Sequence, residues 1–229
     1  MGGKTIMNLM NIDYLGIERV LRRGSGKVIE ESENALLVFD NVSRAYFLAC
    51  EDKALGIAIL DKHNAWEFPL LMTSNYEIGK TAFERYGFNE KLDCYQVAYF
   101  GEKPDTNTQL AFRAANKNDV PQIMEVYDMI STEEMYKVVE RKSLILGYEG
   151  DNLAGFIGEH LEGSMGMLYV LPDFRGKGYG TELERKYIAD TIERGFIPFG
   201  QVEKNNAISL ALQKKLGMTK SENLICWMW

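Results

Sequence analysis

The stretch that most constrains this chain runs from residue 169 to residue 195 and reads YVLPDFRGKGYGTELERKYIADTIERG. An apolar run typical of a strand leads in, a helix-like run leads out, and glycines at positions 176, 178 and 180 lie between them. Glycine lets the backbone turn so that successive N–H groups point inward, and a helix N-terminus adds unpaired donors. With the charges of Arg175 and Lys177, the stretch predicts a phosphate or pyrophosphate site.

Two well-known phosphate loops fit this stretch poorly. The Rossmann fingerprint G-x-G-x-x-G lacks its third glycine, since Thr181 stands in that place, and the strands leading in are expected to be antiparallel. A Walker loop, G-x-x-x-x-G-K-[ST], is absent. The remaining pattern is R-x-x-G-x-G, which Arg175, Gly178 and Gly180 fulfil.

Composition limits the partners and the environment of the chain. A net charge of -7 argues against a nucleic-acid footprint, and no run of about 18 apolar residues is present to span a membrane. The first residues lack the apolar core of a secretion signal. Three scattered cysteines and two histidines predict neither a disulfide framework nor a metal site. We therefore expect a cytoplasmic protein, a monomer or homodimer, with no nucleic-acid or membrane partner.

A polar linker divides the chain. Residues 100–112 gather turn-forming residues between two apolar runs, which places a domain boundary near residue 106. In the second half, Glu162 and Gly163 predict a hairpin, and a helix is expected from about Thr181 to Glu193. The other predicted elements are strands at LAFRAA, KSLILGYEG, LAGFIGEHL, MGMLYVLP, IPFGQV and ENLICWMW, and helices at NKNDVPQIMEVYDMI, capped by Asn118 or Asp119, and NNAISLALQKKLGM.

The first half suggests a repeat of the second. Strands are expected at VIEESENALLVFD, AYFLACED, ALGIAIL and DCYQVAYFG, and a helix at SNYEIGKTAFERYGF. Residues 75–88 align without gaps to residues 205–218, so that Asn75 matches Asn205 and Gly87 matches Gly217. Each segment leads to an aromatic-rich strand with a cysteine. An internal repeat is predicted, although the first copy lacks the glycine loop.

Two motifs resemble a known family. YVLPDFRGKGYG resembles the acyl-CoA pyrophosphate loop of the GNAT N-acetyltransferase superfamily, and VEKNNAISLALQKKLGM resembles that family's next motif. The resemblance covers residues 109–229, and the layout of the chain looks like the glycine N-acyltransferase group. It implies an α/β (α+β) fold of tandem GNAT-like lobes, each a mixed, mostly antiparallel sheet flanked by helices. Residues 1–106 would form a degenerate lobe and residues 107–229 the acetyltransferase domain.

The resemblance also implies a co-substrate, acetyl-CoA or another acyl-CoA. Its pyrophosphate is expected on the glycine loop and its pantetheine arm along the preceding strand, with a backbone N–H near Val170 facing the oxyanion. The implied binding residues are Leu168, Tyr169, Val170, Arg175, Gly176, Lys177, Gly178, Tyr179, Gly180, Thr181 and Asn206.

The usual proton-transfer residues of this family are missing. Ser164 stands where a glutamate base is common, and Gln213 stands where a tyrosine acid is common. His160 and Glu162 lie in the same predicted hairpin and are candidate bases, acting directly or through a water held by Ser164. Structural roles stay open for all three, as a hydrogen-bonded histidine, a solvated hairpin carboxylate and a turn hydroxyl.

These observations favour an N-acyltransferase that moves an acetyl group from acetyl-CoA to the amine of a small molecule or amino acid. Two alternatives remain at this point: a non-catalytic acyl-CoA sensor, motivated by the missing proton-transfer residues, and a protein or peptide N-acetyltransferase.

Overall fold

The computed structural model describes residues 7–229, which fall into two compact units. Unit 1 runs to Ala98 and takes in Gln201–Ala211 and Thr219–Trp229, while unit 2 consists of Tyr99–Gly200 and Leu212–Met218. Because the chain returns to unit 1 after Gly200, one cut near residue 106 does not separate the two units. Within residues 7–229, no helix is both long enough and apolar enough to cross a membrane.

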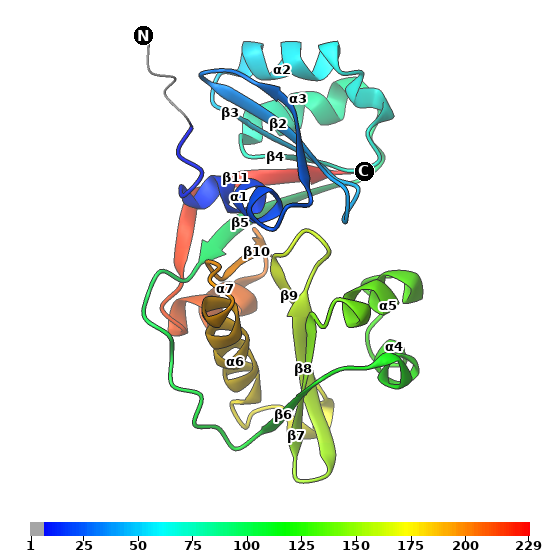
Figure 1. Ribbon diagram of the computed structural model, residues 1–229, viewed down its shortest axis with the longest axis vertical. Coiled ribbons are helices and arrows are strands. Elements are labelled where there is room, and N and C mark those ends of the chain that lie inside the picture. The colour runs from blue at the N-terminus through cyan, green and yellow to red at the C-terminus, as the bar shows by residue number, and fades with distance from the viewer. Residues whose placement is uncertain (1–6) are drawn as a thin grey trace. The chain divides into compact units, whose positions relative to one another are not determined.

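Unit 1 is a mixed sheet with helices on both faces (Figure 1). Its strands follow the order β1-β2-β3-β4-β11-β5, in which only β3 and β4 are parallel. The elements are α1 (Leu15–Arg22), β1 (Gly26–Glu31), β2 (Ala35–Asp40), β3 (Tyr46–Cys50), α2 (Lys53–Lys62), β4 (Leu71–Thr73), α3 (Tyr76–Tyr86), β5 (Lys91–Ala98) and β11 (Thr219–Met228).

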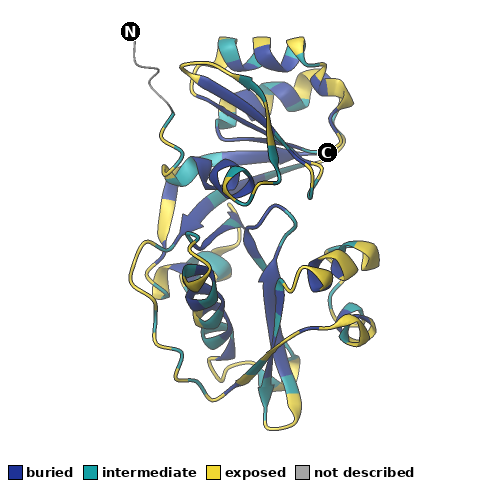
Figure 2. Ribbon diagram, viewed as in Figure 1, coloured by how far each residue is buried: buried dark blue, intermediate teal, exposed yellow. Residues whose placement is uncertain are grey.

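Two cores cover the faces of this sheet, and Figure 2 shows its inner strands β2, β3 and β4 as buried. Successive side chains of a strand point to opposite faces. Leu37 of β2 therefore joins the core beneath α2 and α3, whereas its neighbours Leu36 and Val38 join the core with Ile17 and Val20 of α1. Burial on both faces explains why β2 reads as a continuous apolar run.

Unit 2 contains the second part of the sheet, with helices on both faces. Its sheet follows the order β10-β9-β8-β7-β6, and Figure 1 shows α6 on one face and α4 and α5 on the other. The elements within it are β6 (Ala111–Ala114), α4 (Val120–Met124), α5 (Thr132–Glu140), β7 (Leu144–Glu149), β8 (Asn152–Glu159), β9 (Met165–Val170) and α6 (Tyr179–Glu193). Strand β10 (Phe199–Glu203) belongs to unit 2 up to Gly200, and helix α7 (Ala207–Lys215) belongs to it from Leu212.

The predicted internal repeat is confirmed at the level of element order. The series strand, strand, strand, helix, strand, helix, strand runs from β1 to β5 and again from β7 to β11. Asn75 caps α3, and Gly87 and Gly217 follow α3 and α7 with φ of 78° and 77°. The final strands of both copies lie in unit 1, where β5 and β11 pair antiparallel.

The strand predicted at ALGIAIL is wrong, because these residues form the middle of α2. Asp52 decides the outcome: its side chain accepts a hydrogen bond from the N–H of Leu55 at 2.7 Å and so caps a helix. A short apolar run does not distinguish a buried strand from a helix by periodicity alone. Gly56 also lets α2 approach α3, since a Cβ there would lie 2.5 Å from Cδ1 of Ile78.

The helix predicted across residues 116–130 is shorter than expected. Asn116, rather than Asn118 or Asp119, caps a 3-10 turn through a capping box with Asp119, and α4 then ends at Met124. The chain leaves the helix before Tyr127, whose ring packs edge-on against Phe156 of β8. The other predicted strands and helices of unit 2, including the hairpin at Glu162 and Gly163, are confirmed within a few residues.

Candidate functional site

Helix α6 begins with its first backbone N–H groups unpaired. Gly176 and Gly178 have φ of 79° and 88°, a region that favours glycine, and Gly178 is an N-cap without a side-chain hydrogen bond. Within residues 7–229, the N–H groups of residues 176–180 donate no hydrogen bond to another residue. The first bond of the turn is Thr181 N–H to the Gly178 carbonyl, at 3.0 Å. Unpaired donors and the helix dipole both favour an anion here.

A shallow pocket of about 210 Å³ opens at this helix end. Its walls are Val170, Phe174 and Leu212, together with the glycine loop. Gly180 plays a smaller part than its neighbours, because its φ is ordinary and a Cβ there would meet Val170 at 3.7 Å, a normal contact. The backbone conformation of the loop therefore depends on Gly176 and Gly178.

The two loop cations differ in their surroundings. Arg175 donates from Nε to the carbonyl of Val170 at 3.0 Å, and its guanidinium lies 5.6 Å from the ring of Tyr169. Lys177 pairs with Glu149 at the end of β7, Nζ to Oε2 at 2.9 Å. Glu149 also accepts a hydrogen bond from the Tyr179 hydroxyl. That bond raises the pKa of Tyr179 to about 12, and together with Lys177 it lowers the pKa of Glu149.

Strand β9 has an open edge beside the loop. In the described chain, the parallel strands β9 and β10 pair at one position, Gly200 with Met165. Beyond this pair, the edge of β9 offers backbone groups to an extended ligand, except that the Val170 carbonyl already accepts a hydrogen bond from Arg175. The register of β8 and β9 shifts opposite Ile157, and Met167 takes a φ of 52°, so β9 carries a bulge. Leu168, Tyr169 and Val170 follow this bulge and are half-buried.

The three predicted proton-transfer residues lie in the hairpin between β8 and β9. His160 N–H donates to the Ser164 carbonyl at 2.9 Å, which closes the hairpin. Ser164 is 1% exposed and donates its hydroxyl to the carboxylate of Glu162, which is 8% exposed. The His160 ring lies against Gly166, where a Cβ would come within 2.3 Å of Nε2. Glu162 is therefore a buried, hydrogen-bonded carboxylate rather than a solvated hairpin tip.

Glu134 joins this group from helix α5. Burial raises the pKa of Glu134, His160 lowers it and the charge of Glu162 raises it, so the three side chains share one electrostatic environment. Glu134 also contributes to the raised pKa of Tyr127, about 12, which is due first to burial. No spacing in the sequence points to Glu134, because β7 and β8 separate α5 from the hairpin along the chain.

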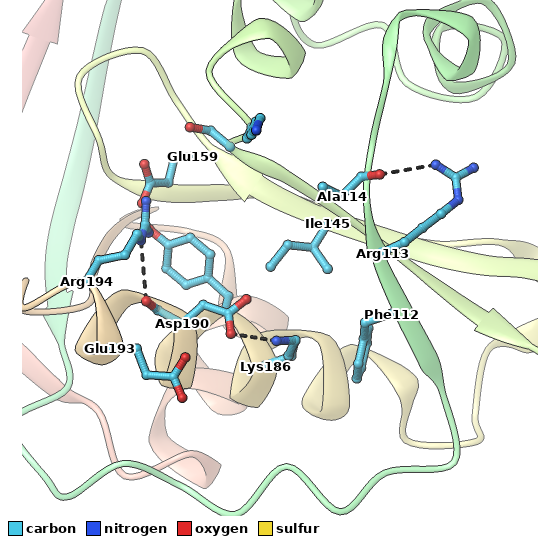
Figure 3. Close-up of a pocket in the computed structure, with 12 residues that line it drawn as sticks. Phe112, Arg113, Ala114, Ile145, Glu159, Lys186, Asp190, Glu193 and Arg194 are labelled. Atoms are coloured by element: carbon cyan, nitrogen blue, oxygen red, sulfur yellow. Dashed lines mark hydrogen bonds and ion pairs between the residues drawn. The ribbon is translucent and has the colours of Figure 1, made fainter.

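A larger pocket of about 450 Å³ lies at the other end of α6 (Figure 3). Glu159 points into it and accepts hydrogen bonds from the Tyr187 hydroxyl, at 3.0 Å, and from the Arg194 guanidinium. Lys186 pairs with Asp190 at 2.6 Å. Because these charges largely satisfy one another, the glycine loop is the better candidate site.

Two residues of the downstream motif lie in unlike settings. Asn206 belongs to unit 1 and accepts the N–H of Ser209 at 3.0 Å, so it helps to start α7; its contact with the pantetheine arm stays a prediction. Gln213 is 4% exposed and donates to the carboxyl of Glu184 at 2.8 Å. The side chain at the usual acid position is thus already engaged.

A family model matches the C-terminal part of the chain. Residues 145–228 match the family model described as FR47-like protein. A comparison with curated proteins gives no match.

Solved structures share the fold. A Drosophila protein superposes with a TM-score of 0.67 at 15% identity, over 85% of this chain and 73% of that one. A GCN5-related N-acetyltransferase from Kribbella flavida has a TM-score of 0.59 at 12% identity, over 97% and 95% of the chains. A GCN5-related N-acetyltransferase-like protein from Streptococcus suis has a TM-score of 0.58 at 15% identity, over 93% and 92%. These similarities establish a GNAT fold.

Proposed function

We propose that this chain, with its FR47-like domain and GNAT fold, is an acetyl-CoA-dependent N-acetyltransferase that acts on the amine of a small molecule or amino acid. One observation carries the proposal: the N-terminus of α6 has no side-chain cap, and it follows the strand β9, which within the described residues pairs with β10 at a single position, Gly200 with Met165. An anion-binding helix end next to an open strand edge suits a ligand with a pyrophosphate and an extended amide-bearing arm.

The residues of unit 2 have separate tasks in this reaction. Acetyl-CoA supplies the acyl group as a thioester. The N–H groups of residues 176–180 hold the pyrophosphate, with Arg175 as the adjacent cation. The free edge of Leu168, Tyr169 and Val170 aligns the pantetheine arm, and a backbone N–H near Val170 faces the developing oxyanion. Binding both substrates in one place contributes to the rate through positioning.

The amine loses its proton to the hairpin in this proposal. His160 or Glu162 accepts the proton, directly or through a water at Ser164. Glu134, whose pKa is affected by the charges of His160 and Glu162, adds a carboxyl group that favours a cationic acceptor. The proton on the amine nitrogen leaves as the C–N bond forms, and the thiolate of CoA is released.

A non-catalytic acyl-CoA sensor is the second candidate. It is favoured by the absence of the usual proton-transfer side chains. Ser164 stands at the usual glutamate position and is bonded to Glu162, and Gln213 stands at the usual acid position and is bonded to Glu184. Such a protein would bind acetyl-CoA without releasing thiol in the presence of an amine. A peptide or protein amine as acceptor is a further outcome of the same assay.

We assign acyl transfer to residues 107–229 and treat residues 1–106 as a degenerate lobe. We also place the reaction in a reducing cytoplasm, because Cys50, Cys94 and Cys226 are buried and none forms a disulfide.

The test is release of free CoA thiol from acetyl-CoA with a panel of small amines, amino acids and peptides. On an active acceptor, His160→Ala should lower kcat/KM roughly 10²–10⁴-fold with little change in CoA affinity if the histidine is the base. The same loss should follow Glu162→Gln instead if the carboxylate is the base. Binding of acetyl-CoA without thiol release from any amine would favour the sensor. Near-normal turnover in both variants would refute the assignment of the base to this hairpin.

A further inference from the structure

Unit 2 contains a buried polar pair that the proposed reaction does not use. Glu184 on α6 is 2% exposed, and Gln213 on α7 is 4% exposed. Nε2 of Gln213 donates a hydrogen bond to Oε1 of Glu184 at 2.8 Å. A carboxyl group so far from water is costly unless its hydrogen-bonding atoms are satisfied.

The two remaining oxygens of the pair have no donor. Within residues 7–229, Oε2 of Glu184 and Oε1 of Gln213 are buried and make no hydrogen bond. If Glu184 is ionised, both atoms are acceptors and neither can satisfy the other. If Glu184 carries a proton, its O–H becomes a donor to Gln213, and the acid and the amide form a ring with two hydrogen bonds. A single proton on Glu184 therefore gives both buried oxygens a hydrogen bond.

The surroundings favour the neutral acid. Burial raises the pKa of Glu184 to about 7, against a smaller lowering by the bond from Gln213. The charged residue of β8, Glu159, is bound by Arg194, and that of β7, Glu149, is bound by Lys177. Strand β9 contributes Tyr169 as its ionisable side chain, and Lys214 and Lys215 beside Gln213 are exposed. None of these groups is among the causes of the shift in Glu184.

We propose that Glu184 and Gln213 form a proton-dependent clamp that ties residues 212–215 of α7 to α6 and so positions Leu212 at the wall of the loop pocket. Leu212 is the chain neighbour of Gln213 and lines the same pocket as Gly176 and Gly178. The two clamp residues are positioning residues, since they act on the pocket through Leu212. The clamp itself follows from the buried pair, whereas its effect on CoA rests on the proposed function.

The sign of the pH effect follows from the raised pKa. The neutral acid contributes stability that is present below the ordinary glutamate value of 4.5 and is lost as the pH rises through about 7. Above that pH, a buried carboxylate faces the Gln213 oxygen and the second hydrogen bond is gone. The wall formed by Leu212 then loosens, and the affinity for CoA falls.

Glu184→Gln tests the clamp, because two facing amides form the same pair of hydrogen bonds without a proton. The wild-type Tm should fall relative to the variant as the pH rises from 5 to 8, with a gap of roughly 4–10 °C at the upper end. The CoA Kd should rise about 3–10-fold over the same range in the wild type and stay constant in the variant. Glu193→Gln is the control on the same helix, since Glu193 is half-exposed and paired with Lys103.

Carbon-13 NMR of the glutamate carboxyl groups provides a direct check in the wild type. The Glu184 signal, assigned by its loss in Glu184→Gln, should titrate near pH 7. A Glu184 signal that titrates at the ordinary glutamate value, or Tm curves of equal pH dependence in both proteins, would overturn the clamp. If the Tm gap opens but CoA affinity changes equally with pH in both, the link to the pocket is wrong. If CoA does not bind while the gap opens, the clamp stands and the proposed function fails.

Discussion

The two units build the same connection in opposite ways. In unit 1, β3 ends at Cys50 and α2 begins at Lys53, so Glu51 and Asp52 join them. In unit 2, β9 ends at Val170 and α6 begins at Tyr179, so residues 171–178 lie between. The short connection carries the carboxylates of Glu51 and Asp52, whereas the long one carries Asp173, Arg175 and Lys177 with two glycines.

The difference lies in what satisfies the helix N-terminus. Asp52 places its own carboxylate on the N–H of Leu55, so α2 already holds an anion that is part of the chain. Gly178 has no side chain to offer, and the first N–H groups of α6 stay available. A small change at a helix cap therefore separates a helix end that its own side chain satisfies from one that is open to an anion.

Breaking the open end should have the largest effect. In Gly178→Val, a β-branched residue cannot adopt a φ of 88° without strain, so the loop must rearrange and its N–H groups turn away. We expect the CoA Kd, measured by calorimetry, to rise roughly 10–100-fold.

Gly87→Val is the matched control for this loop. Gly87 has a φ of 78° and open space around it, as Gly178 has, but it follows α3 in unit 1. It should lower stability and leave the CoA Kd unchanged. Unchanged affinity in Gly178→Val, or an equal loss in both variants, would refute the role of the loop.

Removing the internal anion of unit 1 should affect stability alone. Asp52→Ala loses the cap of α2, which should cost about 1 kcal/mol and lower the Tm by roughly 2–4 °C. Asp52→Asn should stay near the wild type, because asparagine also caps helices. CoA affinity should be the same in all three proteins. A change of CoA affinity in Asp52→Ala would contradict the claim that the N-terminus of α2 has a structural role alone.

The smallest effect is expected at Glu149, whose carboxylate pairs with the loop residue Lys177. Glu149→Gln removes a negative charge near the anion site and frees the Lys177 ammonium. The CoA Kd should fall by roughly 2–5-fold at low salt and by less at high salt, as expected for an exposed pair. A weaker affinity would mean that Glu149 orders the loop rather than competing with the ligand.

Much of unit 2 was predictable because its signals are local. The run from residue 169 to residue 195 contains strand, glycines and helix in order, and α6 begins two residues before the predicted position, at Tyr179. The stretch ALGIAIL misled, since its apolar residues lack a clear period and the deciding contact is the Asp52 cap. The place of β11 in unit 1 depends on pairing with β4 and β5, which no local pattern encodes.

The site was predictable where it depends on backbone and unpredictable where it depends on partners. The spacing of Arg175 and Gly178 in the pattern R-x-x-G-x-G predicts an anion-binding loop. The partners of Glu149, Glu134 and Glu184 are distant in the sequence. Lys177 follows Glu149 by 28 residues, and Gln213 follows Glu184 by 29 residues. The burial of Glu184 was predictable from the sequence, because this glutamate lies on the apolar face of a helix between Leu183 and Tyr187.

The stoichiometry of CoA binding tests the central claim most directly. Calorimetric titration of the intact chain with CoA should give one site per chain, because the N-terminus of α6 is open and that of α2 is occupied by Asp52. Two sites per chain would show that unit 1 also binds the ligand, and no binding would show that the glycine loop is not a CoA site; either result would contradict the account.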